Sequence, residues 1–412
     1  MSKLFGIARF EFLYQLRNPV FWVASAIFFL MGFGLSASEN INIGTPGAVH
    51  ENAPYAIARA TSLLTLFYLF VITAFVANAI VRDDSSGFAP IVRATSVTKA
   101  QIVLGRFLGG LGVAWLGYLA VPLGMFVGSL MPWVDPETIG PQRLVYYSWN
   151  FALFALPDIF LTAAILFALA TTLRSMMASY IGVVLLVMGY LVTIGVLGQK
   201  IEYRDAFAHF EPLGIGALVD VTRYWTQSDM NTRLVEFGGT LAFNRGFTVL
   251  LAIGFLALTL WRFSMTERAP SKRALRRLAR RDARDRRIAA IPPLMSGAGI
   301  TARDAVPSRR IQFLARLRVE SQLVLTSPGT IVLTLFAIIN TGANLWLARS
   351  TYGTSDHPTL AATISGVRGG FTLSLIIIAV FYGGELVWRE RADAGRERGA
   401  AGRGRRGRRF GQ

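Results

Sequence analysis

The residue types that most often carry catalysis are sparse in this sequence, and their spacing matches no common catalytic motif. The chain contains no cysteine and three histidines, His50, His209 and His357. A zinc-binding HExxH motif needs a second histidine four residues after the first, whereas the residue four positions after His50 is Pro54. No lysine follows a glycine, as the Gly-Lys-[Ser/Thr] phosphate-binding loop requires. We therefore expect no enzyme activity, no cofactor and no metal site in this chain.

One acidic side chain, Asp158, lies within an apolar stretch of the sequence. It follows Pro157 in the stretch 149–172. A carboxylate at membrane depth is energetically costly and by default indicates a functional site. A structural interpretation is also open, in which Pro157 breaks the helix and Asp158 accepts hydrogen bonds from the freed backbone N–H groups. We favour the structural interpretation.

The composition is that of a membrane protein. Hydrophobic residues make up 53% of the chain and charged residues 16%, compared with about 25% charged residues in soluble domains. Crossing the hydrocarbon core takes about 20 mostly apolar residues in a helix, and backbone hydrogen bonding in lipid favours helices over open strands. The sequence predicts an all-α integral membrane protein with about eight transmembrane helices, at residues 20–37, 60–81, 108–131, 149–172, 177–197, 246–262, 329–347 and 367–388.

The distribution of basic residues predicts the orientation of these helices. Lysine and arginine favour the cytoplasmic side of membranes. With the N-terminus inside, the inside segments hold most of them, even when the arginine-rich segments 268–287 and 392–412 are left out. Both termini are therefore predicted to be cytoplasmic. The net charge of +18 is concentrated in those two segments. Basic segments beside membrane spans are attracted to anionic lipid, so we expect no nucleic-acid binding from this charge.

A short pattern occurs twice. The same residue types with the same spacing precede the first and seventh apolar stretches, as Arg9, Glu11 and Pro19 and then as Arg318, Glu320 and Pro328. Internal repeats are common in transporters. Each segment before the proline is predicted to be a helix on the inner membrane surface, with the proline in the first turn of the next helix. The alternative is that any two helical hairpins share such features.

The segment between the second and third apolar stretches, residues 82–106, combines acidic, glycine and apolar residues. It could form a short amphipathic helix that contacts a cytosolic partner, or a solvated connector that packs on the bilayer. The pattern alone does not separate these interpretations.

Together, the inside helix, the hairpin and the acidic-glycine turn leading to Gly105-Arg106 resemble the permease subunit of a type-2 ABC exporter. In that family the turn carries the coupling helix that docks on a separate ATPase. The resemblance implies that an ABC ATPase is the partner. It assigns the coupling role to six residues: Asp83, Asp84, Gly87, Phe88, Ile91 and Arg93.

Four segments are similar to one subfamily, bacterial permeases fused to a zinc aminopeptidase-like domain. These are residues 17–22, 74–78, 129–137 and 174–177, and the similarity extends over roughly residues 1–391. It implies a multi-pass protein of the bacterial inner membrane. Such permeases usually have a threonine-proline in the turn where this chain has Thr95-Ser96, so the docking surface is expected to differ. The second coupling turn and the peptidase domain are missing from this sequence.

These observations predict a domain organisation of a six-span permease module followed by the start of a second. The last segment is rich in Arg, Gly and Ala, and we interpret it as a disordered tail read out of frame, with a genuine basic tail as the alternative. The predicted parts are a cytoplasmic elbow helix at 1–19, the first module at 20–262 with a coupling turn at 82–106 and an outside loop at 198–245, a basic linker at 263–308, the start of the second module at 309–391, and the tail at 392–412.

The predicted function is the membrane-spanning subunit of an ATP-driven ABC exporter, in a chain that is expected to be truncated. Two complete halves are not present, so a homodimer or a second permease half is expected as a further partner. Two alternatives stay open at this point. The chain could be the membrane anchor of a peptidase-linked protein, or a membrane scaffold that transports nothing.

Overall fold

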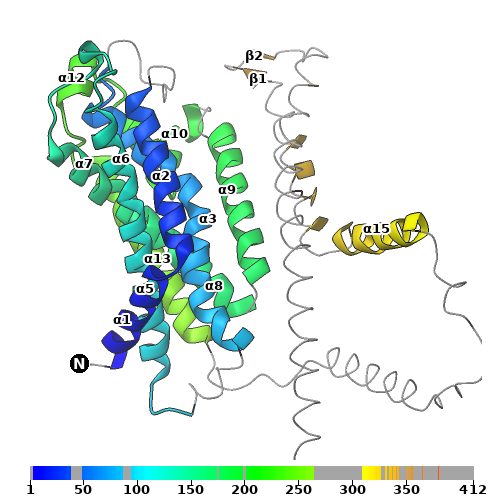
Figure 1. Ribbon diagram of the computed structural model, residues 1–412. Coiled ribbons are helices and arrows are strands. Elements are labelled where there is room, and N and C mark those ends of the chain that lie inside the picture. The colour runs from blue at the N-terminus through cyan, green and yellow to red at the C-terminus, as the bar shows by residue number, and fades with distance from the viewer. Residues whose placement is uncertain are drawn as a thin grey trace, which may run out of the picture. The chain divides into compact units, whose positions relative to one another are not determined.

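The computed structural model describes residues 3–38, 49–86, 94–173, 176–197, 201–263 and 309–325, together with short pieces between 330 and 379. The chain divides into two compact units, Met1–Phe263 with Leu333–Val380, and Ser264–Val332 with Phe381–Gln412. The larger unit contains a bundle of long helices (Figure 1). The second contains α15 (Arg309–Leu325).

Helices make up nearly all of the described structure. Among the described residues, the strands are β1 (Ser350–Thr351) and β2 (Thr354–Ser355), which are two residues long each and pair antiparallel. The elements that build the long helical segments of the bundle are α1 (Lys3–Leu16), α2 (Pro19–Ala37), α3 (Pro54–Ser86), α5 (Lys99–Tyr118), α6 (Ala120–Gly128), α7 (Leu144–Asn150), the π-helical segment η2 (Phe151–Ala155), α8 (Leu156–Leu173), α9 (Met176–Leu197) and α13 (Gly239–Arg262). Of these, α7, η2 and α8 form one continuous segment, Leu144–Leu173. Shorter elements are η1 (Pro136–Thr138), η3 (Ile201–Tyr203), α10 (Arg204–Phe210), α11 (Ile215–Val221) and α12 (Gln227–Thr232).

Five helical segments among the described residues are long and apolar enough to cross a membrane. They are Pro19–Ala37, Pro54–Arg82, Lys99–Gly128, Leu144–Leu173 and Gly239–Arg262. A shorter apolar helix, Ser179–Ile194, lies within α9. The prediction of an all-helical, multi-pass membrane protein is therefore confirmed. Eight spans and cytoplasmic termini stay predictions, since most of the seventh and eighth stretches lies outside the described residues.

Helix α3 lies at the centre of the bundle and packs against α5, α8 and α9. Its apolar side chains are fully buried at several positions, including Leu69, Ile72 and Phe75. By contrast, α2 and α13 expose large apolar side chains such as Leu30 and Leu250. A water-soluble bundle would hide such side chains, whereas a helix that faces lipid tails gains by exposing them. The exposure pattern is consistent with a membrane environment.

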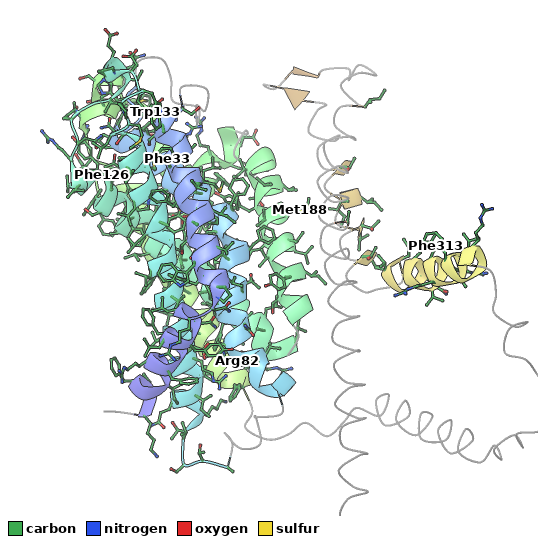
Figure 2. The ribbon with its side chains drawn as sticks, viewed as in Figure 1. Phe33, Arg82, Phe126, Trp133, Met188 and Phe313 are labelled. Atoms are coloured by element: carbon green, nitrogen blue, oxygen red, sulfur yellow. The ribbon has the colours of Figure 1, made fainter. Side chains whose placement is uncertain are left out.

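Helices α2 and α6 approach closely through glycines. A Cβ atom at Gly32 would overlap the carbonyl of Val121, and one at Gly124 would overlap the carbonyl of Phe29. Small residues allow this close backbone contact, which is the usual way in which membrane helices pack. At the end of α2, the Trp133 indole N–H donates to the Ala37 carbonyl at 3.2 Å (Figure 2).

The N-terminal junction follows the predicted pattern. Helix α1 ends at Leu16, and Pro19 occupies the first turn of α2. The Asn18 side chain caps that turn by accepting a hydrogen bond from the Val20 backbone N–H at 3.0 Å. In the second copy of the pattern, Arg318 and Glu320 lie in α15, whereas Pro328 lies outside the described residues.

Candidate functional site

The first candidate site is at the end of the bundle where α3 leads into the predicted coupling turn. Glu11 of α1 and Arg82 of α3 form an ion pair there, with Oε2 2.7 Å from Nη2 and Oε1 3.3 Å from Nη1. The Glu11 side chain is 1% exposed and that of Arg82 19%. Such a two-point contact fixes orientation as well as distance. Helix α1 is thereby joined to α3 immediately before Asp83.

Two neighbouring side chains complete this contact. Gln15, which is buried, donates through Nε2 to Glu11 Oε1 at 2.9 Å and to the Phe75 carbonyl at 3.2 Å. The Tyr14 ring lies 4.0 Å from the Arg82 guanidinium carbon, a cation–π geometry. Arg82 is therefore held by a carboxylate and a ring, both supplied by α1. Figure 2 shows Arg82 near this end of the bundle.

Helix α1 also packs along α5, which begins on the other side of the turn. A Cβ atom at Gly105 would crowd Ile7, and one at Gly109 would crowd Ala8 and Glu11. These glycines allow the two helices to lie in backbone contact. Since α1 contacts α5 here and α3 through Arg82, it bridges both flanks of the turn.

Polar contacts fix the far side of the turn as well. The Lys3 ammonium donates to the backbone carbonyl of Ser96 at 3.0 Å and to its hydroxyl at 2.9 Å. Helix α5 then begins with a capping box, in which Thr98 and Gln101 satisfy each other's backbone N–H groups. Lys99 donates to the carbonyl of Trp261 in α13 at 3.3 Å. The described end of the turn is thus tied to both α1 and α13.

The predicted coupling residues are placed only in part. Asp83 and Asp84 lie in the last turn of α3, and nothing is described of their side chains. The other four, Gly87, Phe88, Ile91 and Arg93, lie outside the described residues. Because α3 continues to Ser86 and α5 begins at Lys99, both ends of the predicted segment 82–106 are helical.

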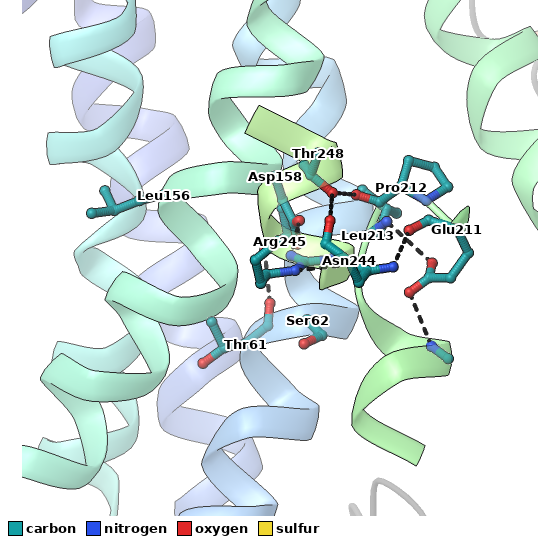
Figure 3. Close-up of polar contacts among 12 residues, drawn as sticks. Thr61, Ser62, Leu156, Asp158, Glu211, Pro212, Leu213, Asn244, Arg245 and Thr248 are labelled. Atoms are coloured by element: carbon teal, nitrogen blue, oxygen red, sulfur yellow. Dashed lines mark hydrogen bonds and ion pairs between the residues drawn. The ribbon is translucent and has the colours of Figure 1, made fainter. Parts of the chain in front are cut away.

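The second candidate site surrounds Asp158, and here the favoured structural interpretation is wrong. The helix does not break at Pro157. It continues through η2, where the Leu156 N–H bonds to the Phe151 carbonyl and one extra residue is taken into the turn. Asp158 is fully buried and its Oδ1 accepts a hydrogen bond from Arg245 Nη1 of α13 at 2.6 Å (Figure 3). Its partner is a cation on another helix instead of freed backbone N–H groups.

Arg245 is itself buried, with 3% exposure. Its Nε and Nη2 atoms donate to Asn244 Oδ1 at 3.0 and 2.5 Å. The backbone of Gly214 lies directly against the guanidinium, so that a Cβ atom there would overlap it. Gly214 has a φ of 72°, in the left-handed region that glycine adopts without strain. Glycine is therefore required at position 214 on two grounds.

Asn244 connects α13 to the turn between α10 and α11. Its Nδ2 lies within hydrogen-bonding distance of three backbone carbonyls, Ala208 at 2.9 Å, His209 at 3.2 Å and Glu211 at 2.8 Å. Carbonyls at a helix C-terminus have no partner within the helix, and Asn244 supplies one. The end of α10 is in this way fixed on α13.

Glu211 follows α10 and is also buried, with 3% exposure. Its Oε2 accepts from the Tyr190 hydroxyl at 2.8 Å and the Leu213 N–H at 3.1 Å, and its Oε1 accepts from the Gly216 N–H at 3.0 Å. Burial raises the pKa of the Glu211 carboxyl, while Arg245 and these hydrogen bonds act in the opposite direction. We refer to Asp158, Glu211 and Arg245 as the buried charge cluster.

Sequence reasoning identified Asp158 but missed Arg245 and Glu211. Arg245 immediately precedes the apolar stretch 246–262 and was assigned to the outside loop 198–245, as was Glu211. A signal was present, because a carboxylate in an apolar span needs a cation from another span.

In the described part of the chain, no three His, Asp or Glu side chains are grouped so as to hold a metal ion.

Comparison with known proteins adds no assignment. No protein-family model matches this sequence, and no curated protein matches it.

Proposed function

We propose that this chain is the membrane-spanning permease subunit of an ATP-driven ABC exporter in the bacterial inner membrane. The observation that carries the proposal is the position of α1. Through Glu11 and Arg82 it is joined to α3, and through Lys3 and Ser96 to the segment before α5. A helix that bridges both flanks of one turn is suited to passing on a force applied to that turn.

The transmission route follows from rigidity. Helices move as rigid elements when domains rotate or shift. A push from an ATPase on the turn would act on the end of α3 next to Arg82, and α3 is the central helix of the bundle. Because α1 is bonded to both sides, α1, α3 and α5 would move together. In this proposal Asp83, Asp84, Gly87, Phe88, Ile91 and Arg93 contact the ATPase.

The outer face of α1 supports a place at the membrane surface. Its acidic residue Glu11 points into the protein, whereas Phe5 and Phe10 are exposed together with Arg9. Rings beside a cation are typical of a helix at the lipid headgroup level. Anionic lipid would then hold α1 at the cytoplasmic surface, while a second permease half or a second copy of the chain would complete the transport path.

The experiment is co-purification from membranes of the native host. The full chain is tagged, solubilised in mild detergent and examined for an ATPase with a phosphate-binding loop. The test variant combines Asp83→Ala, Asp84→Ala and Phe88→Ala. The control combines Arg233→Ala and Glu236→Ala, an exposed ion pair in the segment between α12 and α13.

We expect the wild type and the control to retain the ATPase and the triple variant to lose it. Retention by the triple variant would overturn the docking assignment. Absence of any such ATPase from the wild-type complex would overturn the permease proposal, and would favour the membrane-anchor or scaffold alternatives.

A further inference from the structure

The buried charge cluster has an unbalanced charge. Asp158 and Glu211 contribute two carboxyl groups. Arg245 contributes one cation, which forms an ion pair with Asp158 and interacts electrostatically with Glu211. All three side chains are at most 3% exposed. With every group ionised the cluster would carry one net negative charge away from water. An uncompensated charge in such surroundings is strongly unfavourable, and a buried group commonly becomes neutral instead.

The neighbouring groups do not compensate for this charge. From α5 the Tyr118 hydroxyl donates to the Thr61 carbonyl at 2.5 Å, and from α9 the Tyr190 hydroxyl donates to Glu211. Helix α3 presents the neutral side chains of Thr61 and Ser62 on this side (Figure 3). Arg245 comes from α13 and Glu211 from the turn between α10 and α11. One cation therefore faces two acids in the described surroundings.

Hydrogen bonding indicates which oxygen is free to take a proton. Both oxygens of Glu211 accept hydrogen bonds, and two of the three donors are backbone N–H groups. A backbone N–H cannot reverse its direction, so a proton on Glu211 would displace one of these bonds. Oδ1 of Asp158 accepts from Arg245, whereas Oδ2 is buried and accepts no hydrogen bond from the described residues. Oδ2 of Asp158 is the free position.

We propose that the cluster is a proton-binding site, in which Oδ2 of Asp158 holds one hydrogen ion while Glu211 and Arg245 stay ionised. The cluster is then neutral overall. It joins α8 to α13 through Asp158 and Arg245, and α13 to the α10–α11 turn through Asn244. Loss of the proton leaves a net charge at this junction, so deprotonation favours separation of α8 from the turn.

The backbone next to Asp158 fits such a role. The π-helical segment η2 ends at Ala155, less than one turn before Asp158, and π segments are frequent at functional sites. The Trp115 indole donates to the Leu156 carbonyl at 3.2 Å. The region around Asp158 thus combines an irregular helical backbone with a free carboxylate oxygen, whereas both oxygens of Glu211 accept hydrogen bonds.

The test is infrared spectroscopy of the full-length chain in detergent or lipid at pH 7, where exposed carboxyl groups are ionised. A protonated buried carboxyl gives a C=O stretch distinct from carboxylate bands. Protein labelled with ¹³C in the aspartate carboxyl is compared with protein labelled in the glutamate carboxyl. These samples have the wild-type sequence, so the result does not depend on a variant that folds.

We expect an acid band that shifts with aspartate labelling, does not shift with glutamate labelling, and disappears in Asp158→Asn. Asparagine matches the neutral form of aspartic acid in shape, so we expect this variant to keep the wild-type melting temperature at pH 7. The wild-type melting temperature should fall at alkaline pH as Asp158 loses its proton, and that of Asp158→Asn should not. A band that shifts with glutamate labelling would place the proton on Glu211 and overturn the proposal. Absence of an acid band would overturn it as well.

Discussion

Glu11 and Arg82 are 71 positions apart in the sequence, yet the Glu11 Oε2 atom lies 2.7 Å from Arg82 Nη2. The carboxylate is buried, whereas the guanidinium retains contact with solvent and with the Tyr14 ring. This asymmetry decides what each substitution leaves behind. Removing Arg82 leaves a buried acid without a cation, and removing Glu11 leaves a cation that keeps other partners.

We therefore predict that Arg82→Gln is more damaging than Glu11→Gln. The loss for Arg82→Gln should be about 3 kcal/mol, since one partner of a buried pair is lost. Hydrogen exchange of the α1 backbone amides is the measurement, with thermal unfolding in detergent beside it. Arg233→Gln, in an exposed ion pair, is the control and should change neither the exchange of the α1 amides nor the melting temperature. Equal effects of the two substitutions would contradict the account.

The contact between α1 and α5 can be tested with glycines. Gly109→Ala should destabilise the protein by about 1–3 kcal/mol, because the added methyl group overpacks a closed interface. Gly6→Ala is the matched control on α1 itself, since a Cβ atom there meets nothing within 4 Å. Alanine favours helix over glycine by about 1 kcal/mol, so Gly6→Ala should be neutral or stabilising. A neutral Gly109→Ala would show that α1 does not dock on α5 as described.

Arg245 should be sensitive to loss of charge. Arg245→Gln removes the one cation of the buried charge cluster, and leaving a buried charge without its counter-charge in this way typically costs about 3–5 kcal/mol. Arg245→Lys keeps the charge but loses the planar fork that reaches both Asp158 and Asn244, so its loss should be smaller. The melting temperatures in detergent give the comparison. If lysine and glutamine are equally damaging, hydrogen-bond geometry and not charge holds the cluster together.

Glu211 gives a pH dependence with a defined sign. Burial raises its pKa in the folded state above the ordinary value of 4.5. Between 4.5 and the raised value, the folded chain holds a proton that the unfolded chain has released, so stability falls as the pH rises through this window. We expect the exchange protection of amides in α10 and α11 to fall in the same way. Glu211→Gln should abolish this dependence.

Asp229 in the same loop region should respond in the opposite direction. Hydrogen bonds from the Thr226 hydroxyl and backbone N–H lower the pKa of the Asp229 carboxyl. Its capping of α12 is therefore complete above its ordinary pKa of 3.8 and is lost as the pH falls through the lowered value. Exchange of the α12 amides should accelerate only in strong acid. If α10 and α12 show the same pH profile, the separate environments assigned to these two acids are wrong.

Much of the helical fold could be predicted from apolar stretches alone. The stretches 20–37 and 60–81 correspond to α2 and α3, and 246–262 corresponds to most of α13. Hydropathy placed the start of α3 too late, because it begins at Pro54 and its first turns include Arg59. The short helices α10, α11 and α12 were missed. Helices of six or seven residues are too short to show a clear apolar period.

The pairing of side chains could not be predicted in the same way. Asp158 and Arg245 are 87 positions apart, and they meet only because α8 packs on α13. The interpretation of Pro157 as a helix break was wrong because a π turn accommodates the proline without ending the helix. For α1, the mixture of apolar and charged residues predicted a surface helix but not that its acidic residue would face inward. Such contacts depend on tertiary packing, which a single sequence does not encode locally.

The most direct test of the permease proposal is photo-crosslinking in native membranes. A photoreactive amino acid is placed at position 88, in the predicted coupling turn, and for comparison at Tyr224, an exposed residue between α11 and α12. We predict that position 88 crosslinks to an ATPase with a phosphate-binding loop, that the yield changes when ATP is added, and that position 224 gives no such product. The same ATPase captured equally from both positions, or from neither, would contradict the account.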